Sequence, residues 1–161
     1  MTHRGSLLAA FVGASLLSPP AFAIEVQRTV EVAAAPDEVW AAIGDFCAIA
    51  DWHPVIATCQ IEEQAGVTFR ILTTEDQATL REQLLSMDDD ARFYAYSILE
   101  SPLPVSGYRS TLSVAEAEAA ERATVVWRSE FVPEGMSEQE AAGIIAGIYD
   151  AGLQSLKEAF E

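Results

Sequence analysis

Residues 24–40 read IEVQRTVEVAAAPDEVW, which places an alternating strand pattern directly before the start of a helix. Apolar Ile24, Val26, Val30 and Val32 alternate with polar neighbours, as in a half-buried strand. An early proline and acids in the first turn are typical of a helix start, and both occur in residues 35–38. We therefore predict a strand over 24–32 and short helices between about 36 and 50.

Strand patterns follow this opening for most of the chain. Six of them are joined by short turns, and they cover residues 57–63, 67–74, 78–87, 91–99, 107–117 and 122–132. Apolar residues at helical spacing then run from Met136 to Phe160, and Ser137 followed by Glu140 forms a capping-box motif. The order predicts an α+β fold in which a curved, seven-stranded antiparallel sheet wraps around one long C-terminal helix. A curled sheet does not fit flush against a straight helix, so we expect a cavity between them.

Residues 1–23 have the three parts of a secretory signal peptide. His3 and Arg4 lie near the start, an apolar run covers residues 6–17, and Ala21-Phe22-Ala23 is a small-x-small cleavage pattern. The apolar run is too short to cross a bilayer core of about 30 Å. We expect cleavage after Ala23, export to the periplasm or the exterior, and one domain over 24–161 with no membrane span.

The charge of the chain excludes several classes of partner. It has 9 Lys and Arg against 25 Asp and Glu, and loss of Arg4 with the signal leaves 8 basic side chains and a net charge of −17. Such a surface repels phosphate backbones and anionic lipids, so we expect no binding to nucleic acid. Half of the residues are hydrophobic, which predicts a folded domain rather than disorder.

Several of these segments resemble a known family. The strand and helix start over 32–40, the Gly44-Asp45-Phe46 segment, Trp52-His53-Pro54, residues 102–105 and the terminal helix are similar to the polyketide cyclase/dehydrase-like branch of the START and birch-pollen-allergen superfamily (SRPBCC). The resemblance covers residues 25–161 and implies the helix-grip fold with a small hydrophobic or amphipathic molecule in its cavity. It does not imply catalysis, because the superfamily holds carriers and sensors beside cyclases and dehydratases. Some exported relatives are accessory factors of periplasmic dehydrogenases, so such a protein is a possible partner.

His53 is the only histidine after the signal peptide, and it has two interpretations. It could cap or pack the turn before Pro54, or it could lie at the cavity mouth as a proton donor or ligand contact. A metal site with Cys47 and Cys59 would lack a fourth ligand and matches no zinc spacing, so we expect neither a metal nor a cofactor.

Cys47 and Cys59 are the only cysteines of the chain. In an oxidising compartment two cysteines usually pair, and this pair would fix the Trp52-His53-Pro54 loop. The alternative is two buried thiols.

Strand parity indicates which polar groups face the cavity. Glu82 shares a face with Leu80 and Leu84, so it could be a buried acid or base; alternatively, it lies outward or forms an ion pair with Arg70 or Arg81. The weak catalytic candidates are Glu82, Tyr96 and His53. The full set of expected ligand-binding residues is Trp52, His53, Glu82, Tyr94, Tyr96, Tyr108, Trp127, Ile144 and Ile148.

Three functions are compatible with these residues. The first is a noncatalytic exported protein that holds a small apolar ligand or assists another protein. The second is a cyclase or dehydratase that uses cavity acid and base groups, although no dense charged constellation is visible. The third is a protein-interaction module whose cavity is filled by side chains.

Overall fold

A computed structural model describes residues 22–119 and 121–161, so nearly all of the predicted signal peptide, residues 1–23, lies outside the described residues. In the described part, the chain forms seven strands and three helices. In chain order these are β1 (Ile24–Val32), α1 (Pro36–Ile43), α2 (Ile49–Trp52), β2 (Ile56–Gln64), β3 (Val67–Thr74), β4 (Thr79–Asp88), β5 (Phe93–Glu100), β6 (Val105–Glu116), β7 (Ala123–Pro133) and α3 (Glu138–Ala159).

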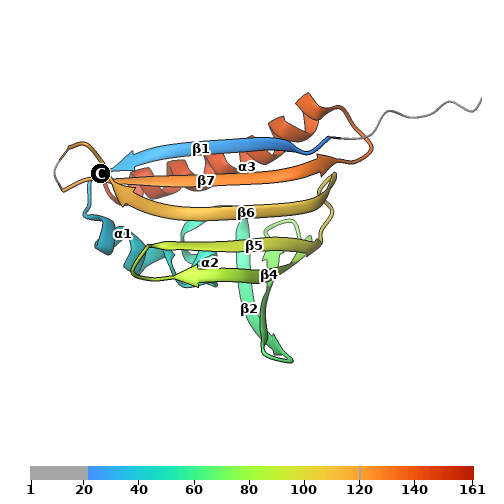
Figure 1. The fold of residues 1–161 in the computed structure, drawn as a ribbon, viewed down its shortest axis with the longest axis horizontal. Coiled ribbons are helices and arrows are strands. Elements are labelled where there is room, and N and C mark those ends of the chain that lie inside the picture. Colours follow the sequence, from blue (N-terminus) through green and yellow to red (C-terminus); the bar gives the residue numbers. More distant parts are fainter. Residues whose placement is uncertain (1–21, 120) are drawn as a thin grey trace, which may run out of the picture.

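The seven strands form one antiparallel sheet with the order β1-β7-β6-β5-β4-β3-β2. β1 therefore closes one edge beside the last strand, while the later strands follow one another as hairpins. The sheet curls strongly: Figure 1 shows β2 running across the direction of β1, β7 and β6. The predicted α+β fold, with its curved seven-stranded sheet and long terminal helix, is confirmed.

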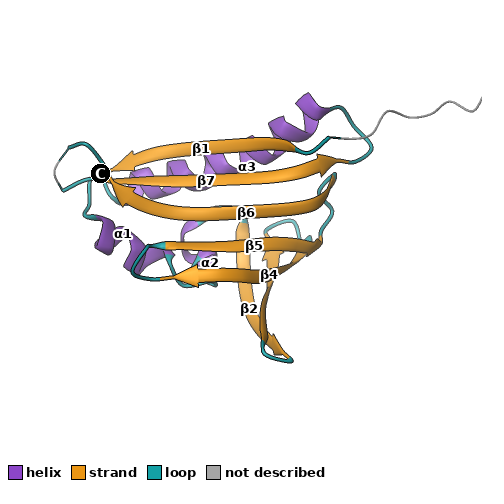
Figure 2. Cartoon of the chain, viewed as in Figure 1, coloured by secondary structure: helices purple, strands orange, loops and turns teal. Residues whose placement is uncertain are grey.

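α3 covers the sheet at the β1 and β7 edge, and the same view coloured by secondary structure shows it behind these strands (Figure 2). Its buried side chains include Ile145, Tyr149, Leu153 and Leu156, which recur at helical spacing. The predicted capping box is present: Ser137 accepts from the Glu140 backbone N–H, and the Glu140 carboxylate accepts from that of Ser137. None of the helices in the described residues is both long and apolar enough to span a bilayer.

The helical segment after β1 consists of two helices, as predicted, separated by a turn. α1 ends at Ile43, and the Asp45 carboxylate then accepts a hydrogen bond of 2.8 Å from the backbone N–H of Cys47. This bond offers the Cys47 N–H an alternative to the hydrogen bond of a continued helix, and such local bonds are the reason why short acidic side chains favour turns. α2 follows with a single helical turn that ends at His53.

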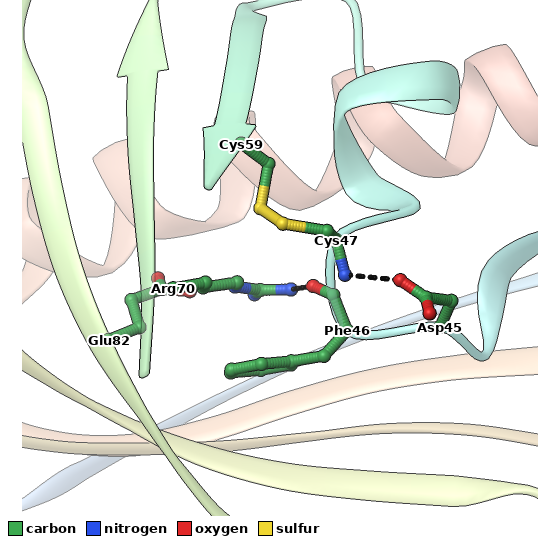
Figure 3. The surroundings of a disulfide bond; sticks show 6 residues. All are labelled: Asp45, Phe46, Cys47, Cys59, Arg70 and Glu82. Carbon is green, nitrogen blue, oxygen red and sulfur yellow. Dashed lines mark hydrogen bonds and ion pairs between the residues drawn. A yellow bond between two sulfur atoms is a disulfide. The ribbon is translucent and has the colours of Figure 1, made fainter. Parts of the chain in front are cut away.

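Cys47 and Cys59 form a disulfide, with their Cα atoms 5.5 Å apart. It ties the turn between α1 and α2 to β2, as Figure 3 shows. The predicted pairing is therefore present, and the alternative of two thiols is not.

Candidate ligand-binding cavity

A small inner chamber of about 50 Å³ lies between the inward face of the sheet, the α2 turn and α3. This volume suits a small chemical group rather than a whole drug-sized ligand. Most of its lining is apolar, and the residues around it are Ile49, His53, Ile56, Leu72, Leu80, Glu82, Tyr96, Ile98, Leu103, Tyr108, Trp127, Ile145, Ile148 and Tyr149.

A larger outer groove of about 390 Å³ adjoins this chamber. Four apolar residues line both spaces, namely Ile56, Leu80, Leu103 and Ile148, so they form the border that the two spaces share. The other apolar residues of the groove are Val55, Ala78 and Pro102, while Thr74, Glu75 and Asp76 provide the polar side. Together the two spaces reach the size range of ligand-binding pockets.

Glu82 and Arg70 form a buried ion pair beside the inner chamber. The Arg70 Nε lies 2.5 Å from Glu82 Oε2, and their side chains are 0% and 4% exposed. The two residues are cross-strand partners on β3 and β4. Glu82 therefore faces inward, as predicted, and it also forms the structural bridge that was the alternative interpretation.

The guanidinium of Arg70 is held on several sides. It donates to the backbone carbonyl of Phe46, the residue before Cys47, as Figure 3 shows. It also lies over the rings of Phe46 and Tyr96, 4.1 and 4.8 Å from their centroids. The disulfide-bonded turn thus contributes directly to the surroundings of the buried arginine.

Burial and the charge of the partner shift the pKa of each member of the pair in opposite directions. Burial raises the pKa of Glu82, and the charge and hydrogen bond of Arg70 act against that rise. Burial lowers the pKa of Arg70, but the Glu82 charge and the neighbouring tyrosines outweigh it, so the net shift is upward. Arg70 is therefore charged, while the pKa of Glu82 is also raised on balance, because burial outweighs the charge and hydrogen bond of Arg70.

His53 bonds the polypeptide backbone with both ring nitrogens. Nε2 lies 3.0 Å from the carbonyl oxygen of Ile148, which can only accept, so Nε2 is the donor. The backbone N–H of Val55 donates to Nδ1 over 3.4 Å. Burial lowers the pKa of His53; the Ile148 bond opposes this, and the charge of Arg70 lowers the pKa further. A neutral imidazole thus joins the α2 turn to the middle of α3.

A hydroxyl network closes the other end of the chamber. The Tyr108 and Tyr149 hydroxyls bond each other, and Ser110 Oγ lies 3.1 Å from the Tyr149 hydroxyl. The indole N–H of Trp127 donates to Ser110 Oγ and to the Tyr96 hydroxyl, over 3.1 and 3.2 Å. Burial holds the pKa values of Tyr96 and Tyr108 well above their usual range, so both are neutral phenols at ordinary pH.

The structure brings six of the nine expected ligand-binding residues to the inner chamber: His53, Glu82, Tyr96, Tyr108, Trp127 and Ile148. Trp52 and Tyr94 are buried in the core but do not line it. Ile144 is 40% exposed and also lies outside the lining, so its expected position was wrong. Its neighbour Ile145 faces inward instead, because both residues fit a loose apolar stripe and only packing sets the rotation of the helix.

Eight residues that line the chamber were not among the nine expected ones, namely Ile49, Ile56, Leu72, Leu80, Ile98, Leu103, Ile145 and Tyr149. Arg70, beside the chamber, was not in the expected set either. Arg70 was considered only as a bridge partner, although Leu72, two residues along the same strand, also points inward. Leu103 lies in the connection between β5 and β6, where no periodic pattern assigns a direction. Strand parity could have predicted that Arg70 points inward. No pattern in the sequence could have predicted the direction of Leu103.

A separate hollow lies apart from this cavity. It has a volume of about 370 Å³ and includes the exposed Arg109, Arg128 and Glu130, which alternate with inward residues and so lie on the face turned away from α3.

Within residues 22–119 and 121–161, no group of three or more His, Cys, Asp or Glu side chains is placed to hold a metal ion.

The family model for "polyketide cyclase / dehydrase and lipid transport" matches residues 23–161, and the chain belongs to this family of the SRPBCC superfamily. Among curated proteins the comparison gives no match.

Solved structures extend the comparison. The chain is similar to the protein XoxI from Bacillus cereus, with 35% identity, a TM-score of 0.80, and coverage of 84% of this chain and 94% of that one. An uncharacterised protein from Bacillus thuringiensis is 34% identical with a TM-score of 0.81, covering 85% and 98%. The Zhui aromatase/cyclase from Streptomyces sp. R1128 has 23% identity, a TM-score of 0.67, and coverage of 85% and 93%, and it supports the fold alone.

Proposed function

We propose that this chain is an exported binding protein that holds a small hydrophobic or amphipathic molecule between its sheet and α3. The observation that carries the proposal is the apolar outer groove, which adjoins the inner chamber through the four shared residues. If side chains filled the interior at the usual packing density, no such space lined by apolar side chains would be expected.

The arrangement of the candidate acid and base groups favours binding over catalysis. The Glu82 carboxylate is paired with Arg70, and both nitrogens of His53 are engaged with backbone groups. The hydroxyls of Tyr96, Tyr108 and Tyr149 are neutral and bond one another, Ser110 or Trp127. A general base needs an available lone pair at a matched pKa, and neither His53 nor these hydroxyls offer one, while the Glu82 carboxylate is held in an ion pair.

Export and an accessory role form the second part of the proposal. The Cys47–Cys59 disulfide supports an oxidising compartment, and the resemblance to exported accessory proteins supports a periplasmic dehydrogenase as partner. N-terminal sequencing of the exported protein should start at Ile24, and retention of residues 1–23 would contradict the export proposal. Co-purification with a dehydrogenase from periplasmic extract, lost in high salt, would support the partner, and its absence under gentle conditions would count against it.

An environment-sensitive apolar dye tests ligand binding. The folded protein should bind it saturably at about one site, and Ile148→Trp should weaken binding roughly tenfold or more, since Ile148 lines both spaces. Overpacking can destabilise a core by about 1–3 kcal/mol, so unfolding of the variant is measured alongside.

Gln154→Trp is the matched control, because Gln154 lies on the exposed face of the same helix and bonds Glu158. It should leave the dye affinity unchanged. If both variants bind dye as the unmodified protein does, the cavity is not the binding site and the interaction-module alternative gains support.

A further inference from the structure

The cavity has a charge pattern that restricts which amphiphile it can take. Among the residues that line the inner chamber and the outer groove, none is a lysine or an arginine. The acidic residues of that lining are Glu82 inside and Glu75 and Asp76 at the outer groove. An anionic ligand would therefore meet carboxylates in both spaces and no lysine or arginine among the lining residues.

Glu82 presents one oxygen that the protein leaves unused. Arg70 Nε bonds Oε2, and within the described residues no donor bonds the other oxygen, Oε1. The Arg70 Nη2 atom, which a side-on bidentate pair would place on that oxygen, has no partner there. Glu82 lines the chamber, and a carboxylate oxygen without a donor keeps its lone pairs for a bound molecule.

We infer that the cavity selects an amphiphile whose head is an uncharged or cationic hydrogen-bond donor, such as an alcohol or an amine, and rejects carboxylates. The head lies in the inner chamber at Glu82, and the apolar body extends past Leu103 and Ile148 into the outer groove. The volumes agree with this division: about 50 Å³ accommodates a hydroxyl or amino group, and about 390 Å³ accommodates the body. This inference rests on the proposed binding function and adds its ligand class.

Four probes with the same octyl chain or, in the acid, the same total of eight carbons test the inference: octanol, octylamine, octanoate and methyl octyl ether. Each competes with the apolar dye at neutral pH, where the amine is a cation and the acid an anion. Octanol and octylamine should displace the dye at concentrations at least about tenfold lower than octanoate or the ether, which lacks a donor. Equal or tighter binding of octanoate would overturn the inference.

A paired variant assigns the preference to Glu82. Removing Glu82 alone would strand a buried charge on Arg70, so both are replaced in Arg70→Met/Glu82→Leu, an exchange that often leaves stability intact. This variant, once a sharp thermal transition shows that it folds, should bind octanol no better than the ether. Glu38→Gln, which changes an exposed acid of α1 outside the lining of both spaces, should retain the preference of the unmodified protein for octanol over the ether.

The outcomes separate the two proposals. If the dye does not bind the unmodified protein at all, the proposed function fails and the inference fails with it. If the dye binds but all four probes compete alike, the ligand class is wrong while the binding function stands. If the preference persists in the paired variant, Glu82 is not the anchor. Should that variant not fold, the four-probe ranking on the unmodified protein still decides the ligand class.

Discussion

At the scale of single residues, the buried pair of Arg70 and Glu82 has no counterpart in the rest of the described chain. The other ion pairs of residues 22–119 and 121–161 each include a side chain that is more than half exposed. Exposed pairs contribute about 0–1 kcal/mol, whereas removing one partner of a buried pair costs about 3–5 kcal/mol. The interior pair therefore stabilises the arrangement of the chamber only as long as both partners remain.

Parity on β4 was enough to predict that Glu82 faces inward. With Glu82 inward, alternation turns its neighbour Arg81 to the other face, but parity could not predict that Arg70 on β3 lies opposite Glu82, because that depends on the register of the two strands. The structure settles this: Arg81 lies over the Phe69 ring, 4.0 Å from its centroid, and near Glu62.

His53 gives the fold a predictable pH dependence. Its pKa lies below 6.5 in the folded chain, chiefly because of burial, so the unfolded chain binds a proton first as the pH falls. The contribution of His53 to stability is thus complete above about pH 6.5 and is lost as the pH falls through the folded pKa, by at most about 1.4 kcal/mol per pH unit.

Urea unfolding of the unmodified protein and of His53→Gln, measured from pH 7.5 to pH 5, isolates this effect. Gln cannot take up the proton but keeps an amide donor for the Ile148 carbonyl. The unmodified protein should lose more unfolding free energy over this range than the variant. Parallel losses in the two proteins would show that His53 does not carry the pH dependence.

At the scale of elements, the sequence predicted the strands and α3 to within a few residues, because their apolar periods are long and regular. The break between α1 and α2 depended on the Asp45 side chain bonding the Cys47 backbone, a local contact that periodicity does not report. The packing of α2 on α3 could not be predicted from the sequence either, because it depends on the space that one glycine, which has no side chain, leaves between the two helices.

Gly152 allows the α2 turn to approach α3. A Cβ atom at this position would lie 2.5 Å from His53 Cδ2 and 2.9 Å from the Trp52 ring. Gly152→Ala should therefore destabilise the fold by about 1–3 kcal/mol, although alanine is the better helix former.

Gly147→Ala is the matched control in the same helix. Nothing lies within 4 Å of a Cβ atom there, so alanine should stabilise the fold by about 0.5–1 kcal/mol through helix propensity. Chemical denaturation of both variants measures the difference. Two stabilising substitutions would mean that the α2 turn does not press against α3 as described.

At the scale of the whole molecule, the order of strands and helices sufficed to predict a curved sheet around a helix with a cavity between them. The division of that cavity was not predictable, since it depends on Leu103 in a loop and on which isoleucine of α3 turns inward. Four of the six expected residues that line the inner chamber, Glu82, Tyr96, Tyr108 and Trp127, lie on strands, where alternation assigns each side chain to a face. Ile144 was wrong because a helix leaves its rotation to tertiary packing.

The central claim is that a small amphiphile occupies the space between the sheet and α3. Nuclear Overhauser effects between bound octanol and the labelled methyl groups of the protein test it most directly. The account predicts cross-peaks to Ile56, Leu80, Leu103 and Ile148, the residues shared by the inner chamber and the outer groove. Cross-peaks confined to exposed apolar side chains such as Leu85 and Leu99, with none to those four residues, would contradict it.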